Sequence, residues 1–175
     1  MGKLNFIPDR EMDDDYAAKI WSSLHDQKLL HRCFWDGSNQ TPDDFLGFVR
    51  HPQTTVFSVE NEVETFALVW ITDWPSRYTA CLHFCGLRNT WGKLSLQIGQ
   101  FVHFNLFNAT RAEGYAYLKV AVGYLPATNV LALKYIEKLG YKKKSVIPGA
   151  CHLHYQKRDV DAVVAYCTKE TFMEN

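Results

Sequence analysis

The segment from Tyr115 to Tyr141 limits the possible folds of this chain more than any other part of the sequence. It begins with Tyr115 to Val122, a run rich in aromatic and β-branched side chains, which is typical of a β-strand. A turn containing Pro126 follows, and then a stretch whose apolar residues recur at helical spacing. Gly140 favours the left-handed backbone that ends a helix, and Tyr141 opens the next predicted strand. The segment therefore predicts a strand, a helix and a second strand in succession.

The helix of this segment has both a start signal and an apolar face. Thr128 or Asn129 can cap its first turn, because a side-chain oxygen at that position accepts a backbone N–H. The predicted apolar face consists of Val130, Leu133, Ile136 and Leu139. An ordinary βαβ unit needs the same start and stop signals, so this pattern alone does not identify a function.

The remaining sequence predicts further strands and helices in a defined order. Residues 55–59, 64–71 and 78–87 are rich in strand-forming side chains and are joined by short connections, which predicts an antiparallel meander. The helix predicted at 92–108 is apolar on nearly every side, so we expect it to be deeply buried. The other predicted elements are a strand at 4–7, one or two helices within 13–30, a helix at 41–49, strands at 141–147 and 151–157, and a closing helix at 160–169. This order predicts an α+β fold with helices on both faces of a central, mostly antiparallel mixed sheet.

Length and composition narrow the class of protein. The 175 residues, 47% of them hydrophobic, can bury one substantial core, and no repeat or linker divides them, so we expect a single domain spanning 1–175. The formal net charge is zero and no long basic run occurs, which argues against nucleic acid as a partner. Apolar runs such as Thr65 to Thr72 are far shorter than the roughly 20 residues that span a bilayer. We therefore expect a cytoplasmic protein with no membrane partner.

The five cysteines are scattered and include no C-x-x-C pair, so we expect no structural disulfide. Cys81, His83 and Cys85 would share one face of a strand and so deserve consideration as metal ligands. Along an extended strand, however, the two cysteines are roughly 13 Å apart, too far to share one zinc ion with Zn–S bonds of about 2.3 Å. We therefore predict no metal site.

The helix that starts at Asn129 resembles the corresponding helix of the GNAT superfamily of acyl-coenzyme A-dependent N-acyltransferases. Family sequences commonly have an Asn, an Ala three residues later and a Glu-Lys-Leu-Gly-aromatic ending; Asn129, Ala132 and the run from Glu137 to Tyr141 fit in register. The predicted order of elements is also similar to the GNAT fold over nearly the whole chain, while the motif-level similarity is confined to Tyr78 to Tyr141. The resemblance implies that acetyl-CoA or another acyl-CoA is a substrate.

The resemblance also assigns coenzyme-binding roles to the region before and after Leu87. In GNAT proteins the strand before the long buried helix offers backbone groups to the pantetheine arm, and the following loop and helix start hold the pyrophosphate. Family loops commonly read R-x-x-G-x-G; here Arg88 and one displaced glycine remain. The residues assigned to coenzyme binding are Phe84, Cys85, Gly86, Leu87, Arg88, Trp91, Gly92, Lys93, Leu94 and Asn129.

The chain departs from the family pattern at two catalytic positions. Ile136 replaces a tyrosine that often protonates the departing thiolate, and the nearest substitute, Tyr135, is turned about 100° around the helix axis. Cys81 replaces a glutamate that some members use as a base. His83 shares the face of Cys81 and titrates near neutrality, so it is the predicted general base, with Tyr135 as the candidate acid. A core histidine without a catalytic role is the alternative for His83.

Two kinds of function remain open from the sequence. The first is transfer of an acyl group from acyl-CoA to an unknown amine. The second is a GNAT-shaped protein that has lost catalysis and binds a protein partner, similar to phage-encoded accessory or head-assembly factors, which would associate it with virions. Trp70, Trp74, Tyr78 and Trp91 cluster around the predicted cleft and suit an acyl acceptor, a partner protein or the core.

Overall fold

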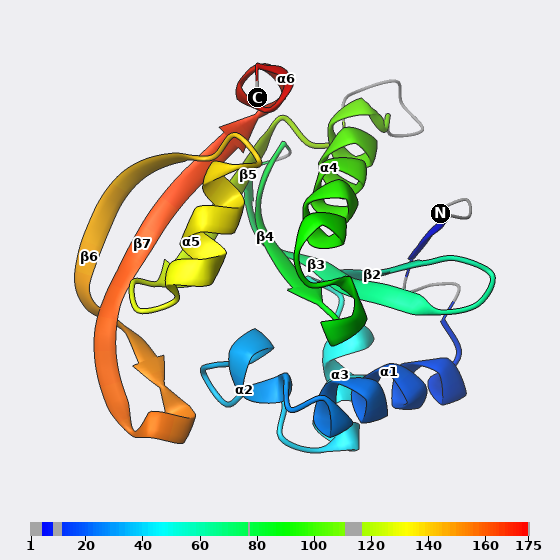
Figure 1. Ribbon diagram of the computed structural model, residues 1–175. Coiled ribbons are helices and arrows are strands. Elements are labelled where there is room, and N and C mark those ends of the chain that lie inside the picture. The colour runs from blue at the N-terminus through cyan, green and yellow to red at the C-terminus, as the bar shows by residue number, and fades with distance from the viewer. Residues whose placement is uncertain (1–4, 9–11, 77, 111–116, 175) are drawn as a thin grey trace.

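A computed structural model describes residues 5–8, 12–76, 78–110 and 117–174, which form one seven-stranded sheet with helices on both faces (Figure 1). The strand order is β1-β2-β3-β4-β5-β7-β6. All neighbouring strands are antiparallel except β4 and β5, which run parallel. The predicted fold class is confirmed.

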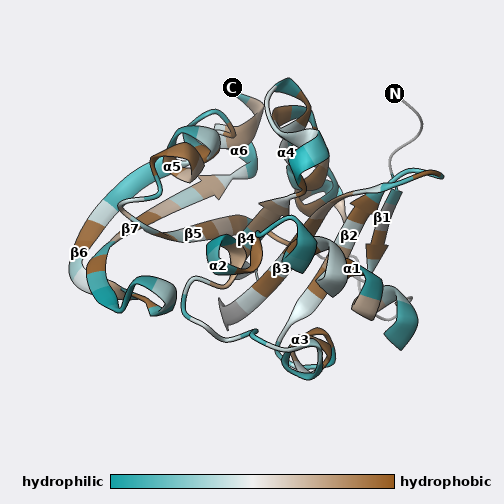
Figure 2. Ribbon diagram, turned by 60° about the horizontal axis from the view of Figure 1, so that its bottom comes forward, coloured by the Kyte–Doolittle hydropathy of each residue, from teal (hydrophilic) through white to brown (hydrophobic). Residues whose placement is uncertain are grey.

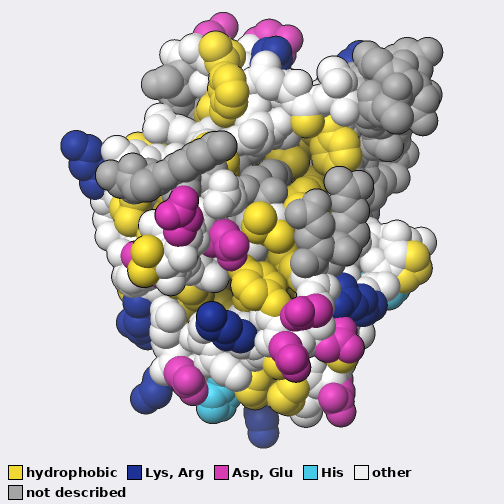
Figure 3. All heavy atoms as spheres, turned by 90° about the vertical axis from the view of Figure 1, so that its right-hand side faces the viewer, with side chains coloured by type: hydrophobic (Ala, Val, Ile, Leu, Met, Phe, Trp, Pro, Cys, Tyr) yellow, Lys and Arg dark blue, Asp and Glu magenta, His cyan; other side chains and the backbone are white. Residues whose placement is uncertain are grey.

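The elements follow one another in the predicted order up to the last quarter of the chain. Their bounds are β1 (Asn5–Pro8), α1 (Asp14–Asp26), α2 (Leu30–Cys33), α3 (Pro42–Val49), β2 (Thr55–Glu60), β3 (Thr65–Ser76), β4 (Thr79–Gly86), the 3-10 helix η2 (Arg88–Thr90), α4 (Lys93–Asn108), β5 (Val120–Pro126), α5 (Val130–Glu137), β6 (Lys142–Leu153), the 3-10 helix η3 (His154–Gln156), β7 (Arg158–Thr168) and α6 (Lys169–Met173). Within the described ranges, no helix is both long and apolar enough to cross a bilayer. Figure 3 shows acidic and basic side chains interspersed on one face of the molecule.

Alternating residues of β3 divide the core between the two faces of the sheet. Val69 and Ile71 belong to a cluster under α4, whereas Leu68 and Trp70 belong to a second cluster with α1 and α3. Figure 2 shows α1, α2 and α3 on one side of the sheet and α4, α5 and α6 on the other. A side chain on the central strands therefore reaches one helical layer or the other.

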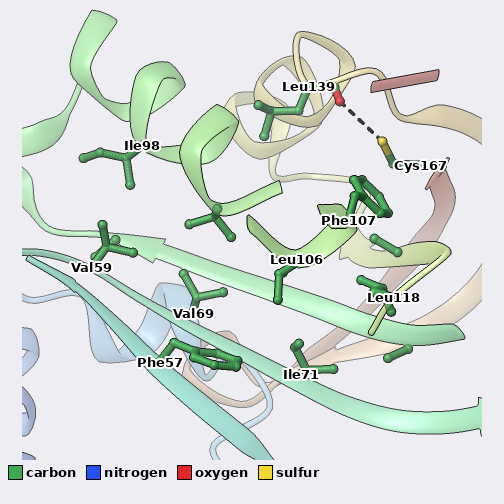
Figure 4. Packing of buried hydrophobic residues seen from close by; sticks show 14 of the residues in the cluster. Phe57, Val59, Val69, Ile71, Ile98, Leu106, Phe107, Leu118, Leu139 and Cys167 are labelled. Atoms are coloured by element: carbon green, nitrogen blue, oxygen red, sulfur yellow. Dashed lines mark hydrogen bonds between the residues drawn. The ribbon is translucent and has the colours of Figure 1, made fainter. Parts of the chain in front are cut away.

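Helix α4 buries one flank rather than its whole circumference. Ile98, Val102 and Leu106 are buried against the sheet, and Figure 4 shows Ile98 and Leu106 among the side chains of this cluster. Phe104 points outward and is 55% exposed. The prediction of burial on nearly all sides, with Phe104 in the core, was wrong, because a helix lying on a sheet buries only the stripe that faces it.

Helix starts and stops agree well with their sequence signals. The Thr41 hydroxyl accepts the backbone N–H of Asp44, and the Asp44 carboxylate accepts that of Thr41, which forms a capping box. Asn129 caps α5 by accepting the N–H of Ala132. Gly140 ends that region with a φ of 86°, as predicted. The local chemistry of these ends therefore needed no tertiary information.

Two predictions around α5 were wrong in detail. β5 comprises Val120–Pro126, so Pro126 ends a strand, and the residues just before Val120 are not in that strand. Residues 115 and 116 lie outside the described ranges. Val130 was expected on the apolar face of α5 but is 53% exposed, whereas Leu139, just after the helix, is buried.

The closing helix predicted at 160–169 is wrong, because these residues fall mostly in β7. Ala162, Ala165 and Cys167 are buried there as part of a strand that pairs with β5 on one side and β6 on the other. The two short strands predicted on either side of Pro148-Gly149 are also wrong, since β6 continues through both residues with a register shift between Ile147 and Cys151.

The expectation of no disulfide was wrong as well. Cys33 of α2 and Cys85 of β4 are disulfide-bonded, with their Cα atoms 5.9 Å apart. The two residues are 52 positions apart in the sequence, and only the packing of α2 on the sheet brings them together. The cysteine spacing therefore contained no signal for the bond.

Strands β4 and β5 pair over three residues and then separate. The parallel register runs Thr79↔Val120, Ala80↔Ala121 and Cys81↔Val122. Beyond these pairs, β4 continues along β3 and β5 continues along β7. The last pair is Cys81↔Val122, so the two strands part after these residues.

Candidate functional site

A cavity of about 110 Å³ lies where β4 and β5 separate. Its walls include residues 82–84 of β4, residues 123–126 of β5 and the inner face of α5, and residues of α2, β3 and α4 complete them. The α5 residues that line it are Ala132, Tyr135 and Ile136, with the cap residue Asn129. The site thus forms where β4 and β5, the one parallel pair of the described sheet, part from each other.

A second cavity, of about 270 Å³, shares part of its wall with the first. The second cavity lies among α2, α3 and the sheet, and it will be called the aromatic cavity because Phe34, Trp35, Phe48 and Trp70 line it. The residues that border both cavities are Cys33, Trp35, Trp70 and His83.

His83 stands at this boundary, and the sheet fixes its position. It is the cross-strand partner of Trp70, and the two rings stack with centroids 5.1 Å apart and planes 2° apart. The Nε2 atom is 3.0 Å from the Thr72 hydroxyl. Because a hydroxyl both donates and accepts, Thr72 can hold the imidazole in either tautomer. His83 thus lies in the wall of both cavities, while its role as a base stays a prediction.

Tyr135 lines the first cavity, but its hydroxyl is directed at α4. The hydroxyl donates to the carbonyl of Ser95 at 3.0 Å, and the ring stacks on Phe84. A Cβ added to Gly99 would lie 2.2 Å from this hydroxyl, so the close approach depends on glycine at that position. Burial raises the pKa of Tyr135 well above its usual range. Both features weaken Tyr135 as an acid, and that role stays a prediction.

The loop after β4 is held by Trp91. Its indole N–H donates to the carbonyl of Gly86 at 3.1 Å, at the end of β4. The guanidinium groups of Arg88 and Arg32 lie 4.9 Å and 5.4 Å from the centre of the Trp91 ring. Arg88 also anchors the loop on α1, because its Nε–H donates to the Gln27 carbonyl at 2.6 Å. This loop is therefore braced, with two cations beside it.

The start of α4 has no side-chain cap. Gly92 precedes the first helical residue and offers no side chain to cap the first N–H groups of the helix. Lys93 is exposed at the first helical position. An uncapped helix start with cations nearby is a favourable place for an anion, because the backbone N–H groups and the helix dipole both attract negative charge.

The predicted coenzyme-binding residues of β4 contribute differently. Cys85 is buried and disulfide-bonded, and Leu87 is buried with its N–H donating to the Phe66 carbonyl at 2.8 Å. Phe84 lines the first cavity with its ring. Backbone groups of successive strand residues alternate between the two edges, so part of the 82–86 backbone faces the side that β5 has left. Because the Cys85 side chain is buried in the disulfide, Cys85 could serve a ligand only through its backbone groups.

The sequence matches no protein-family model, and no curated protein matches it. In three dimensions it is similar to spermidine N-acetyltransferase from Vibrio cholerae, crystallised with CoA and spermine, with a TM-score of 0.74 and 12% identity over 97% of this chain and 98% of that one. It is also similar to the microcin C7 self-immunity acetyltransferase MccE, crystallised with acetyl-CoA and AMP, with a TM-score of 0.65 and 13% identity over 89% and 88% of the two chains.

The chain has the GNAT acetyltransferase fold. At such low identities the likeness extends to the fold alone, so the chemistry of this GNAT-fold site depends on its own side chains. Within the described residues, no group of three or more His, Cys, Asp or Glu side chains is placed to hold a metal ion.

The site of this GNAT-fold chain includes residues that the sequence did not indicate. Trp35 borders both cavities, stacks near Tyr124 of β5 with ring centroids 6.4 Å apart, and accepts the N–H of His154 at its carbonyl. The ring of His154 packs so close to Gly37 that an added Cβ would lie 2.5 Å away. The hairpin of β6 and β7 thereby contacts the loop after α2. No local pattern could reveal this contact.

Proposed function

We propose that the protein transfers an acyl group from acyl-CoA to an amine by direct attack on the thioester. The observation that carries this proposal is the position of His83, at the boundary between the cavity where β4 and β5 part and the aromatic cavity. A transferase that joins two substrates needs two adjoining pockets with a proton acceptor between them.

The first cavity suits the pantetheine arm of acyl-CoA. The chain offers an open strand edge along residues 82–86, and a pantetheine amide can hydrogen-bond to such an edge as an added strand would. The uncapped start of α4, with Arg88 and Lys93 beside it, suits the pyrophosphate. One feature opposes the fit, since the Trp91 indole already occupies the carbonyl of Gly86 and has to release it if the coenzyme uses that group.

The proposed reaction begins with a neutral amine in the aromatic cavity. Its nitrogen attacks the thioester carbonyl carbon, the new C–N bond forms, and the C–S bond breaks as CoA leaves as a thiolate. The proton lost by the nitrogen passes to the His83 imidazole, which the Thr72 hydroxyl orients. Burial and the bond to Ser95 make Tyr135 a poor donor to sulfur, so the thiolate takes its proton from solvent.

Isothermal titration with acetyl-CoA tests the proposal, with two neighbouring substitutions on α5 as a matched pair. Ala132→Trp fills the first cavity, which Ala132 lines, while Leu131→Trp adds the same ring at a position that is 70% exposed and outside that cavity. We expect the unsubstituted protein and Leu131→Trp to bind acetyl-CoA and Ala132→Trp to lose binding. No binding at roughly millimolar acetyl-CoA, or equal binding by both variants, would overturn the proposal.

A second candidate is a binding protein with the same fold and no turnover. It is favoured by the bond of Trp91 to Gly86 and by Ile136 at the family's tyrosine position. This candidate predicts that no amide forms from acetyl-CoA with any amine, even where titration detects coenzyme. Neither relative named above is an assembly factor, so co-purification with virion proteins would be needed to support a phage role.

A further inference from the structure

The aromatic cavity has rigid walls of a distinct chemistry. Phe34 and Trp70 are both buried and stack with ring centroids 5.2 Å apart and planes 24° apart. Phe48 meets Trp70 edge to face, with centroids 5.7 Å apart. Because these rings support one another, they form a preorganised surface, and an aromatic or compact apolar group can pack on it without ordering flexible side chains.

The charge in the aromatic cavity is small and negative. Asp36 is the one carboxylate among its described lining residues, which include no Lys or Arg. The Asp36 carboxylate accepts the N–H of Ser38 at 3.1 Å, which holds it in place. One carboxylate attracts a single ammonium group. The other polar lining groups are Ser38, His51, Gln53, Thr54, Thr72 and His83.

A polyamine does not match this arrangement. Several ammonium groups along an aliphatic chain need several carboxylates, and the described carboxylates that gather around a cavity are Glu60, Glu62 and Glu64. Those three line a separate cavity of about 370 Å³ between α1 and the β2–β3 hairpin, which has no lining residue in common with the aromatic cavity. The presence of spermine in the Vibrio cholerae structure therefore does not carry over to this chain.

We propose that the acyl acceptor is an arylalkylamine, a single primary amine on a short chain that ends in an aromatic ring. The volume of about 270 Å³ suits a small molecule of this size. The ring packs on Phe34, Phe48 and Trp70, and Asp36 attracts the ammonium form. The ammonium group releases one proton to solvent, and the neutral nitrogen then attacks at the boundary with the first cavity, where His83 takes the second proton. The inference rests on the proposed function, because it names the acceptor of the same transfer.

Binding of the amine can be measured without acyl-CoA, which separates this inference from the proposed function. Trp35 and Trp70 line the cavity, so quenching of tryptophan fluorescence can report occupancy, with calorimetry as a second readout. The probes are 2-phenylethylamine, spermidine and 2-phenylethanol, the last of which has the ring without the charge. We expect 2-phenylethylamine to bind roughly tenfold or more tightly than spermidine.

The substitution Asp36→Asn supplies the sharper test. We expect it to weaken binding of 2-phenylethylamine roughly tenfold and to leave 2-phenylethanol unchanged, because only the amine carries the charge that Asp36 attracts. Asp26→Asn is the matched control, since Asp26 is exposed on α1 and lines none of the three cavities. Equal losses for the amine and the alcohol, or no loss for either, would overturn the assignment.

The two proposals fail in different ways. If 2-phenylethylamine binds as expected but acetyl-CoA does not, the acceptor cavity stands and the transferase proposal falls. If acetyl-CoA binds and its acyl group passes to spermidine but not to 2-phenylethylamine, the transferase stands and the arylalkylamine assignment is wrong.

Discussion

Trp70 and His83 lie directly opposite each other on β3 and β4, and their rings stack in parallel 5.1 Å apart. Trp70 is buried against the α1 and α3 layer, so the imidazole rests on a wall that cannot move without disturbing the core. The stack and the Thr72 hydroxyl together limit the rotation of His83. A histidine held in this way would be preorganised for the proposed proton transfer.

The His83→Gln variant should lose acyl transfer. Glutamine can still bond to Thr72 but cannot take up a proton near neutral pH, so we expect kcat to fall by roughly a hundredfold or more while the Kd of acetyl-CoA stays unchanged. His152→Gln is the control, because His152 is exposed, pairs with Asp159 and lines neither site cavity. Equal rates for the two variants in a thioester-cleavage assay would show that His83 is only structural.

The Trp91→Phe variant should bind acetyl-CoA more tightly. It keeps an aromatic ring for Arg88 and Arg32 but removes the indole N–H that occupies the Gly86 carbonyl. A released carbonyl is worth about 1 kcal/mol to a ligand that can use it, which corresponds to roughly a fivefold lower Kd by calorimetry. Trp21→Phe is the control, because it removes a buried indole N–H from α1, 70 positions before Trp91 in the sequence, and should leave the Kd of acetyl-CoA unchanged. Weaker binding by Trp91→Phe would mean that the indole itself contacts the coenzyme.

The Gly99→Ala variant should destabilise the fold through close contacts with Tyr135 and Leu139, of which the contact with the Tyr135 hydroxyl is the shortest. A methyl group there would meet the Tyr135 hydroxyl at 2.2 Å, so we expect a loss of about 1–3 kcal/mol in the free energy of unfolding, measured with urea. Gly47→Ala on α3 has open space at the same atom and should be neutral or slightly stabilising. Combining Gly99→Ala with Tyr135→Phe should recover part of the loss, and a purely additive result would exclude the contact as its cause.

Acidification should destabilise the protein through His103. This histidine is buried, with Nδ1 against the carbonyl of Gly99 and Nε2 against the hydroxyl of Tyr141. The carbonyl only accepts, so Nδ1–H donates to it and Nε2 accepts from Tyr141, which fixes the neutral tautomer. Burial lowers the pKa of His103 from 6.5 to about 4.

The sign of this effect follows from the lowered pKa. Between pH 6.5 and about 4 the unfolded chain binds a proton at this position and the folded chain does not. The contribution of His103 is therefore complete above pH 6.5 and is lost as the pH falls toward 4, by about 3 kcal/mol in total. Urea unfolding of His103→Gln over the same range should show a smaller slope, and an unchanged slope would assign the pH dependence to other groups.

Reduction should destabilise the chain through the Cys33–Cys85 bond. Closing a loop between residues 52 positions apart restricts the unfolded chain, and the entropic model assigns this about 4 kcal/mol. Urea unfolding with and without dithiothreitol measures the difference. A Cys33→Ser/Cys85→Ser double variant has no bond to reduce, so its stability should not respond to dithiothreitol; a response of the same size would point to a different cause.

The fold was predictable where local chemistry decides it. Short-range rules predict the capping box at Thr41, the cap at Asn129 and the glycine stop at Gly140. They also predict the meander of β2, β3 and β4. The closing strand β7 was missed, because residues 160–169 carry Ala and Val that suit either a helix or a strand. Pairing with β5 and β6 on its two sides decides the outcome, and that pairing is not local.

The candidate site was predictable only in part. His83 could be placed in a cleft because strand alternation puts it on the same side as Cys81. Arg32 lies in the four-residue helix α2 and Trp35 follows it, and so short a helix has no clear periodic signal. The disulfide of Cys33 depends on the same helix. Packing of a short segment against a distant strand is a tertiary property, so the aromatic cavity was largely invisible in the sequence.

The contact between His154 and Gly37 links the far end of the β6–β7 hairpin to the loop that carries Trp35 and Asp36. Amino-acid changes more than a hundred positions downstream can therefore reshape the aromatic cavity without touching any residue that lines it. Evolution or engineering could retune the shape of that cavity through the length and sequence of the hairpin, while the strands that hold His83 stay as they are.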